Sequence, residues 1–206
     1  MAANSRISMQ KTILAIVALA LFGIAQAQVQ FSGACSCDVQ VQPNFDVAAY
    51  LGSWYEYAKY PVYFETNGKC VKAEYTLKDN GQVGVVNSMI DETTDQASDI
   101  VGYAVVVENA KLLVTFPVSP AYNVSSNYWV LSTDYTSYSV VYSCQQTQDD
   151  SHSLVVWILT REQNPSAELI AKAKDVLTSN GVSLSQLVVT DQSGCQADAA
   201  AGDDCA

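Results

Sequence analysis

The feature that most constrains the fold is a series of short segments rich in Val, Tyr, Thr and Ile, separated by turn signals. The segment 69–78, for example, ends at Asp79-Asn80-Gly81, which is a strong hairpin signal. Regular short strands joined by tight turns are typical of an antiparallel sandwich or barrel. We therefore expect about eight strands, namely the aromatic stretch 50–61 followed by 69–78, 82–90, 98–107, 111–118, 127–135, 138–146 and 153–160.

The last of these segments, 153–160, is apolar on both of its faces. Successive side chains of a strand point to opposite sides. One side carries Ser153, Val155, Trp157 and Leu159, and the other carries Leu154, Val156 and Ile158. A sheet with one face in solvent needs only one apolar side. Since both sides of this segment are apolar, we expect one face to line an interior and the other to lie under a helix. The interior of a small closed barrel holds side chains or one small ligand.

The sequence pattern changes from strand-like to helical between Asn164 and Gly181, and it predicts a helix there. Asn164 is predicted as its N-cap, with Pro165 in the first turn and Gly181 as its C-terminal stop. The apolar stripe at helical spacing consists of Leu169, Ala173, Val176 and Leu177. One such amphipathic helix would cover the outside of a sheet, and the segment 185–192 predicts one more short strand.

The N-terminus predicts a secretory signal peptide over residues 1–27. Arg6 and Lys11 give a basic start, an apolar run follows over 12–25, and Ala25 and Ala27 form a small-x-small cleavage site. The alternative is an uncleaved membrane anchor, but no basic flank follows the apolar run to stop transfer. We expect a secreted chain of residues 28–206 that forms one domain and is not embedded in a membrane, with a disordered tail over 196–206.

The charge of the chain excludes one class of partner. The formal net charge is −11, from 10 Lys and Arg against 21 Asp and Glu, and removing the basic signal peptide makes the chain more acidic still. An acidic protein is repelled by nucleic acid and by anionic membrane surfaces. We therefore expect no nucleic-acid partner.

The cysteines predict disulfides rather than a metal site. The six are Cys35, Cys37, Cys70, Cys144, Cys195 and Cys205. An even number in an oxidising compartment indicates up to three disulfides, but sequence alone does not choose the pairs. Cys35 and Cys37 are too close together for an ordinary zinc motif, and His152 is the only histidine of the chain. We expect no metal.

Three short motifs resemble those of the lipocalin family. They are Gly52-Ser53-Trp54, Thr133-Asp134-Tyr135 and the arginine of the stretch 157–162, which is Arg161. Their order and spacing fit, and the resemblance covers nearly all of residues 28–206. Further short matches, such as 44–46, 57–61 and 68–75, resemble the branch of apolipoprotein D and the insect bilin-binding, insecticyanin-like proteins.

The resemblance implies an all-β fold, an eight-stranded antiparallel up-and-down barrel with one C-terminal α-helix packed on its outside. Trp54 would close one end of the barrel, with Arg161 across its ring as a cation–π contact. Gly52 would permit a tight backbone at the entrance to the first strand. Members of this family are mostly carriers or chromoproteins without enzymatic activity.

The resemblance also narrows the disulfides. It implies Cys70–Cys195, and it implies that either Cys35 or Cys37 pairs with Cys144. The chain departs from the family here, because the stretch 35–37 offers two candidates. The cysteine that remains would pair with Cys205 or stay free.

The same resemblance implies a ligand site in the mouth of the barrel, most simply for biliverdin or a similar tetrapyrrole. The alternative is a carrier of lipid, steroid or carotenoid. The residues expected to face the ligand are Val62, Phe64, Asn87, Met89, Ile100, Val114, Phe116, Tyr128, Ser143, Val155 and Trp157. Asn87 and Ser143 would meet pyrrole N–H groups, and Lys59 or Lys69 would meet the propionates.

No enzymatic activity and no required cofactor are expected, because the chain has neither a G-x-S-x-G nor an H-E-x-x-H pattern. A secreted enzyme of lipocalin fold is the remaining alternative, but residues 54–58 hold no cysteine of the kind that prostaglandin-synthesising lipocalins use. Asn123 is a glycosylation sequon in an expected loop, whereas Pro165 disqualifies the one at Asn164. Self-association into a homo-oligomer, as in a pigmented assembly, is a further hypothesis.

Overall fold

The structure is a computed structural model that describes residues 28–147 and 150–195. The predicted signal peptide, the predicted tail and Cys205 lie outside the described residues. Within them, no helix is long and apolar enough to span a membrane.

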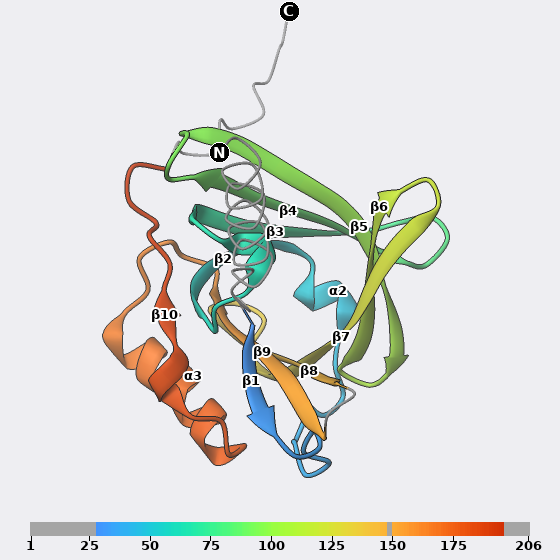
Figure 1. Ribbon diagram of the computed structural model, residues 1–206, viewed down its shortest axis with the longest axis vertical. Coiled ribbons are helices and arrows are strands. Elements are labelled where there is room, and N and C mark those ends of the chain that lie inside the picture. Colours follow the sequence, from blue (N-terminus) through green and yellow to red (C-terminus); the bar gives the residue numbers. More distant parts are fainter. Residues whose placement is uncertain (1–27, 148–149, 196–206) are drawn as a thin grey trace, which may run out of the picture.

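Eight antiparallel strands form a closed barrel, as predicted (Figure 1). The sheet follows chain order, and pairing of the first barrel strand with the last closes it. The strands are β2 (Gly52–Lys59), β3 (Gly68–Leu77), β4 (Val83–Asp91), β5 (Gln96–Glu108), β6 (Lys111–Ser119), β7 (Tyr122–Thr133), β8 (Tyr138–Gln146) and β9 (Ser151–Thr160). Short helical turns flank β2, namely α2 (Val47–Tyr50) before it and the 3-10 helix η1 (Tyr63–Glu65) after it.

The strand β7 begins five residues earlier than the predicted 127–135, and this overturns the prediction that Asn123 lies in a loop. Asn123 is within β7 and pairs with Pro117 of β6. The hairpin turns instead around Pro120, where proline cannot donate to the sheet. The side chain of Asn123 is nevertheless exposed.

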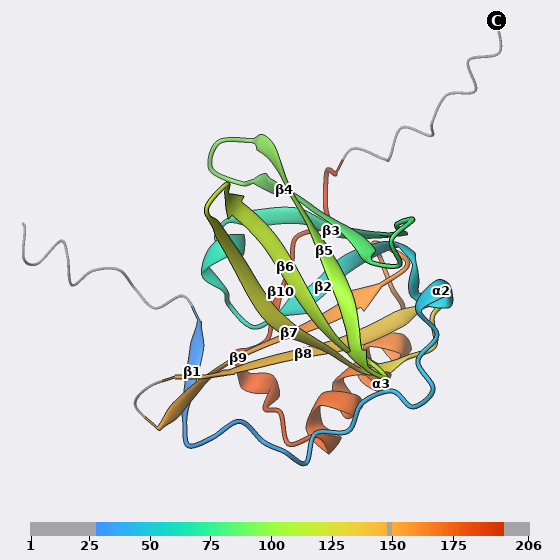
Figure 2. The ribbon, with the colours of Figure 1, turned by 90° about the vertical axis from the view of Figure 1, so that its right-hand side faces the viewer.

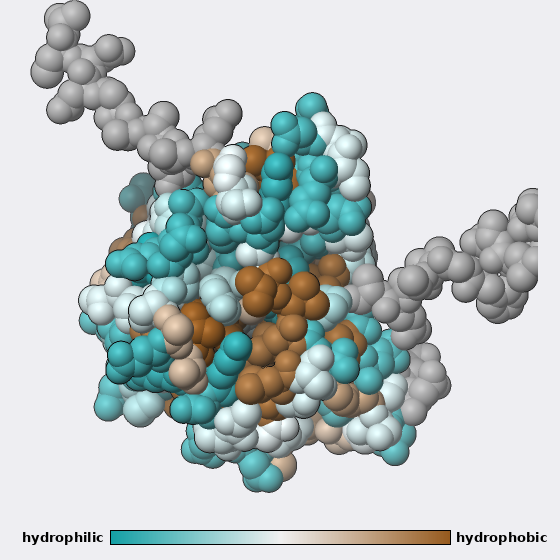
Figure 3. All heavy atoms as spheres, turned by 90° about the vertical axis from the view of Figure 1, so that its left-hand side faces the viewer, coloured by the Kyte–Doolittle hydropathy of each residue, from teal (hydrophilic) through white to brown (hydrophobic). Residues whose placement is uncertain are grey.

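Two further short strands join the sheet in addition to the eight barrel strands. The strand β1 (Val29–Ser32), which the sequence did not predict, pairs with the first half of β9. The predicted strand in 185–192 is observed as β10 (Val188–Val189), just after the 3-10 helix η2 (Leu184–Gln186). Both valines of β10 are exposed. The face that carries β10 and the long helix shows a hydrophobic area within a largely hydrophilic surface (Figure 3).

The long helix α3 (Ala167–Ser179) lies against the outside of the barrel, over β7 and β8 (Figure 2). Its N-cap is Ser166, whose hydroxyl accepts a hydrogen bond from the Leu169 N–H, so the prediction of Asn164 is wrong. Asn and Ser are comparable caps, and proximity to the first helical N–H groups decides between them. Gly181 follows the helix with a φ of 73°, as expected of its stop.

The two apolar faces of β9 pack into two separate cores. Val156 and Ile158 are fully buried beneath α3, in a cluster that includes Leu177. Leu159 belongs to a second cluster inside the barrel, around Trp54. The prediction that one face of 153–160 lines the interior and the other lies under a helix is therefore confirmed.

One end of the barrel is closed by Trp54 and Arg161. The guanidinium carbon lies 3.7 Å from the centroid of the Trp54 ring. Arg161 also donates hydrogen bonds to the carbonyl oxygens of Ser53 and Leu51, each at 2.8 Å, and of Tyr135 at 3.0 Å. Gly52 has a φ of 92°, and a Cβ there would lie 3.3 Å from the Arg161 guanidinium. This arrangement explains why glycine, tryptophan and arginine are all needed.

The turn between β7 and β8 belongs to the same closed end. The Asp134 carboxylate accepts hydrogen bonds from the backbone N–H groups of Ser137 at 2.8 Å and of Tyr138 at 3.1 Å. Thr133 donates from its hydroxyl to the Tyr138 carbonyl at 2.7 Å. These bonds fix the turn at the position that the motif predicts.

Two disulfides staple the barrel. Cys35, not Cys37, pairs with Cys144, and Cys70 pairs with Cys195. Cys37 is exposed and has no disulfide partner among the described residues. Each bridge is expected to add about 2–4 kcal/mol to stability.

The C-terminal segment fills a gap in the barrel wall. β2 pairs with β3 only as far as Tyr55, and β10 then takes the place of β3 beside Ala58 and Lys59. The Cys70 N–H donates to the Asp191 carbonyl at 2.8 Å, so the same segment also joins β3. The Gln192 amide donates to the carbonyls of both strands, each at 2.9 Å. The chain therefore uses its last described residues as part of the wall.

Candidate ligand-binding site

A cavity opens at the end of the barrel opposite Trp54. It encloses about 620 Å³, which includes space open to solvent at its mouth. Ligand pockets are of this size and are mostly apolar with a few polar groups. We call this space the mouth cavity. Six of the residues expected to face a ligand line it, namely Phe64, Asn87, Val114, Phe116, Tyr128 and Trp157.

The other five expected residues do not line the mouth cavity. Met89 and Ile100 lie further toward the rim on the inward face, and Ile100 is 44% exposed. Ser143 and Val155 are buried opposite each other on β8 and β9. Val62 is buried at the start of η1. Ligand contact by any of the eleven residues stays a prediction.

Several lining residues were missed by sequence reasoning, and strand alternation could have found most of them. Glu56 follows Trp54 by two residues on β2, and Val85 precedes Asn87 by two on β4. Both therefore face the interior. Others that line the cavity are Glu65, Val71, Lys72, Ala73, Tyr75, Ser126, Asn127 and Leu159. No local pattern indicated Glu65, because it belongs to the short turn η1.

Asn87 carries the one buried side-chain oxygen or nitrogen that lacks a hydrogen-bond partner among the described residues, its Oδ1. Leaving a buried acceptor unpaired costs about 1–3 kcal/mol. Neighbouring Asn127 shows the contrast, because its amide donates to the Cys144 carbonyl at 3.0 Å and accepts from Ser143 at 2.8 Å. Asn87 lines the mouth cavity, so a rotation of its side chain would bring this buried acceptor to a donor group of a ligand.

A buried ionic cluster stands in the same wall. Lys59 lies 2.9 Å from Glu56 and 2.7 Å from Glu65, and Thr190 of the C-terminal segment donates to Glu56. Burial, and then the charge of Glu65, raises the pKa of Glu56 to about 8 despite the opposing effect of Lys59. Burial alone would lower the pKa of Lys59, but the two carboxyls outweigh it and the pKa is raised.

This cluster changes the predicted role of the lysines. Lys59 is held by Glu56 and Glu65 and is not in the cavity lining, and Lys69 lies 3.2 Å from Asp95. Lys59 is therefore not placed to meet a propionate as expected. For Lys69, whose partner Asp95 is largely exposed, that role stays a prediction. Lys72 does line the cavity, and it takes part in an interaction of its own.

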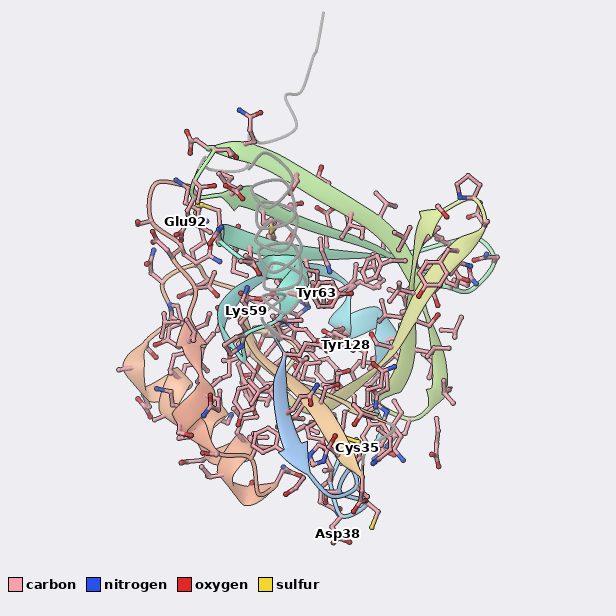
Figure 4. All side chains as sticks on the ribbon, viewed as in Figure 1. Cys35, Asp38, Lys59, Tyr63, Glu92 and Tyr128 are labelled. Carbon is pink, nitrogen blue, oxygen red and sulfur yellow. A yellow bond between two sulfur atoms is a disulfide. The ribbon has the colours of Figure 1, made fainter. Side chains whose placement is uncertain are left out.

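Three tyrosines, of which Tyr50 and Tyr75 are buried and Tyr128 is partly buried, separate the mouth cavity from the closed end. Figure 4 shows Tyr128 in the barrel interior. The Tyr128 hydroxyl bonds to those of Tyr75 at 2.9 Å and Tyr50 at 3.0 Å. Tyr50 bonds in turn to the Ser139 hydroxyl at 2.8 Å. We call Tyr50, Tyr75 and Tyr128 the tyrosine floor.

His152, the only histidine, has a structural position. Its Nδ1 lies 2.8 Å from the Gly33 carbonyl, and its ring stacks on Phe31 of β1. It is absent from the lining of the mouth cavity. Among the described residues, no three or more of His, Cys, Asp and Glu are grouped so as to hold a metal ion.

A closed antiparallel barrel with an apolar cavity at one end and a tryptophan–arginine plug at the other defines the lipocalin class. The chain belongs to the lipocalin family, since the family model for a lipocalin-like domain matches residues 45–192.

Its relatives come from mammals and insects. The chain is 42% identical over 194 residues to apolipoprotein D of Bos taurus, covering 91% of this chain and 98% of the relative. It is 37% identical to the Lazarillo protein of Schistocerca americana, covering 84% and 85%. The solved structure of insecticyanin from Manduca sexta superposes with a TM-score of 0.73 at 28% identity, covering 81% and 90%.

Proposed function

We propose that this protein is a secreted carrier that holds one small hydrophobic ligand in the mouth cavity, with a ligand N–H or O–H group donating to Asn87. The observation that carries the proposal is the unpaired Asn87 Oδ1 in an otherwise largely apolar cavity. A ligand donor would remove the cost of that buried acceptor, which gives binding both affinity and orientation.

The size of the cavity sets the expected affinity. Burying roughly 300 Å² of apolar ligand surface contributes about 7–8 kcal/mol at 25 cal/mol per Å². Loss of freedom on binding removes several kcal/mol of this. The expected dissociation constant therefore lies in the micromolar to nanomolar range.

An uncharged lipid or steroid with a hydroxyl group meets these conditions best. It needs no cation at the mouth, and Lys59, one of the two lysines expected to receive propionates, is held by two carboxyls. This favours a ligand of the lipid or steroid class over the tetrapyrrole expected first. Biliverdin remains the second candidate, because its pyrrole N–H groups are donors of the kind that Asn87 can accept.

The protein acts in this proposal by binding alone, outside the cell. The polar side chains that line the cavity are two amides, two carboxyls, one lysine and three hydroxyls, and no hydrogen bond found among the described residues pairs the Ser126 hydroxyl with a base. Both disulfides suit an oxidising compartment. Association into a homo-oligomer stays a hypothesis that sedimentation of the purified protein would test.

The test starts with the absorption spectrum and mass spectrum of whatever co-purifies with the mature protein. Titration with biliverdin and with a neutral hydroxysteroid then follows, each monitored by tryptophan fluorescence because Trp157 lines the cavity. We expect the steroid to bind more tightly and the affinity to fall about tenfold in Asn87→Leu, the loss of one buried hydrogen bond.

Three other outcomes are informative. A blue-green protein with a near-red absorption band would establish biliverdin instead. Equal affinity of the wild type and Asn87→Leu for the hydroxysteroid would remove Asn87 from the site. If neither ligand binds and nothing co-purifies, the carrier function itself is wrong.

A further inference from the structure

A second, nearly filled hollow lies below the mouth cavity. It spans about 300 Å³ when the gaps between its side chains and space open to solvent are included, and its walls include Phe45, Ala104 and Leu112 of the core around Trp54. The two spaces share Tyr75, Val114 and Tyr128 in their linings. A partition only one side chain thick therefore divides the interior.

The tyrosine floor is held from below. Tyr50 packs on Trp54 with ring centroids 5.1 Å apart, and the Trp54 indole N–H donates to the Tyr50 carbonyl at 2.9 Å. Trp54 is in turn covered by Arg161. The floor is thus continuous with the plug that closes the barrel.

Moving Tyr128 would break the floor at its centre. Its hydroxyl is the shared partner of Tyr50 and Tyr75, so its departure would leave the Tyr75 hydroxyl without the partner it has now. Burial raises the pKa of Tyr50 to about 12 and raises that of Tyr128 well above its usual value. The hydroxyl protons, and with them the network, therefore persist across the neutral range.

We propose that the tyrosine floor sets the depth of the ligand site and so selects compact, ring-shaped hydrophobic ligands over long straight chains. A compact ligand fills the mouth cavity above the floor. A straight chain longer than that depth leaves its far end in water, and each further methylene then adds nothing to the binding free energy. This inference rests on the proposed function and states which of the hydrophobic ligands the site accepts.

The test is a series of straight-chain primary alcohols, from octanol to octadecanol, that compete with a fluorescent reporter for the mature protein. In the wild type, each added methylene should raise affinity roughly fourfold while it is buried, and affinity should then level off. In Tyr128→Ala, which joins the two spaces, we expect affinity to keep rising to longer chains. Tyr128→Leu should give a smaller shift in the same direction, and it keeps the test available if the alanine variant does not fold.

Tyr122→Ala is the matched control, because Tyr122 is on the same strand but 64% exposed and outside the cavity lining. The affinity of Tyr122→Ala for the alcohols should level off at the same chain length as that of the wild type. The proposal that the tyrosine floor limits the depth of the site is wrong if wild-type affinity rises through the whole series. It is also wrong if the affinities of both Tyr128 variants level off at the same chain length as that of the wild type. If the hydroxysteroid binds the wild type but no alcohol does, the depth of the site is not what selects the ligand and the inference fails alone. If the hydroxysteroid and biliverdin also fail to bind, the carrier function fails as well, so the two failures are distinguishable.

Discussion

The two ends of the barrel interior differ in how completely their polar groups are paired. At the closed end, the Arg161 guanidinium satisfies several backbone carbonyls and covers Trp54, and the hydroxyls of the tyrosine floor bond to one another. At the open end, Asn87 Oδ1 has no partner, and two carboxyls share Lys59. The comparison teaches that the closed end is built for stability, whereas the open end retains unfavourable features that only a ligand or a function would explain.

The largest expected effect tests the closed end. Trp54→Ala should lower the free energy of unfolding by about 3–5 kcal/mol, because it removes a fully buried ring and the partner of Arg161. Trp157→Ala, in the partly exposed wall of the mouth cavity, should cost less stability and more ligand affinity. Urea denaturation of both variants measures the change in unfolding free energy. Equal losses of stability in the two variants would contradict the distinction between the two ends.

The next effect tests the ionic cluster through pH. The folded-state pKa of Glu56 is about 8 against a usual value of 4.5, so the folded state binds its proton more tightly. The resulting stabilisation is complete below about pH 4.5 and is lost as pH rises through 8. Glu56→Gln stays neutral, so at pH 9 it should exceed the wild type by on the order of 2–4 kcal/mol in unfolding free energy.

The control for this prediction is Glu74→Gln, the same change at an exposed position on β3. Its difference from the wild type should be small and should not vary with pH. The raised pKa of Glu56 lies between pH 5 and 9. If the unfolding free energies of Glu56→Gln and the wild type change in parallel over this range, the pKa of Glu56 is not raised.

The smallest effect compares two asparagines of the cavity wall. Asn87→Leu should raise the unfolding free energy of the ligand-free protein by about 1 kcal/mol, because it removes a buried acceptor that has no partner. Asn127→Leu should lower it by about 1–3 kcal/mol, because the Cys144 carbonyl and the Ser143 hydroxyl lose theirs. Thermal unfolding without ligand measures both changes. A loss of stability in Asn87→Leu would show that the amide of Asn87 is paired in the wild type.

The sequence predicted the closed end better than the open end, for a physical reason. Gly52 and Trp54 lie in one short motif and Arg161 lies in another, and each motif can be identified from a few adjacent residues. Their resemblance to family motifs predicted the contact between Trp54 and Arg161, although the two residues are far apart in the chain. Strand alternation likewise predicted the two faces of β9, because the period of a strand is local.

The open end depends on contacts between distant residues, which no local pattern reveals. The cluster of Glu56, Lys59 and Glu65 needs Thr190, which is 134 residues from Glu56 in the chain. Of the positions carried over by register, Asn87 lines the mouth cavity, whereas Met89 lies further along β4 and Ile100 is 44% exposed. Ligand contact at each of them stays a prediction. The choice of Cys35 over Cys37 as partner of Cys144 likewise depended on where the N-terminal segment crosses the barrel.

The segment 188–192 that fills the gap between β2 and β3 has a consequence for the order of folding during synthesis. The wall beside Ala58 is finished by residues that are synthesised long after it, and the disulfide that secures them spans 125 residues. Contacts between residues so far apart in sequence form slowly. A nascent chain therefore exposes the carboxyl of Glu56, which is buried in the folded protein, and an open seam until residues 188–192 have been synthesised. A truncation before Thr190 would leave that seam permanently available to chaperones or to aggregation.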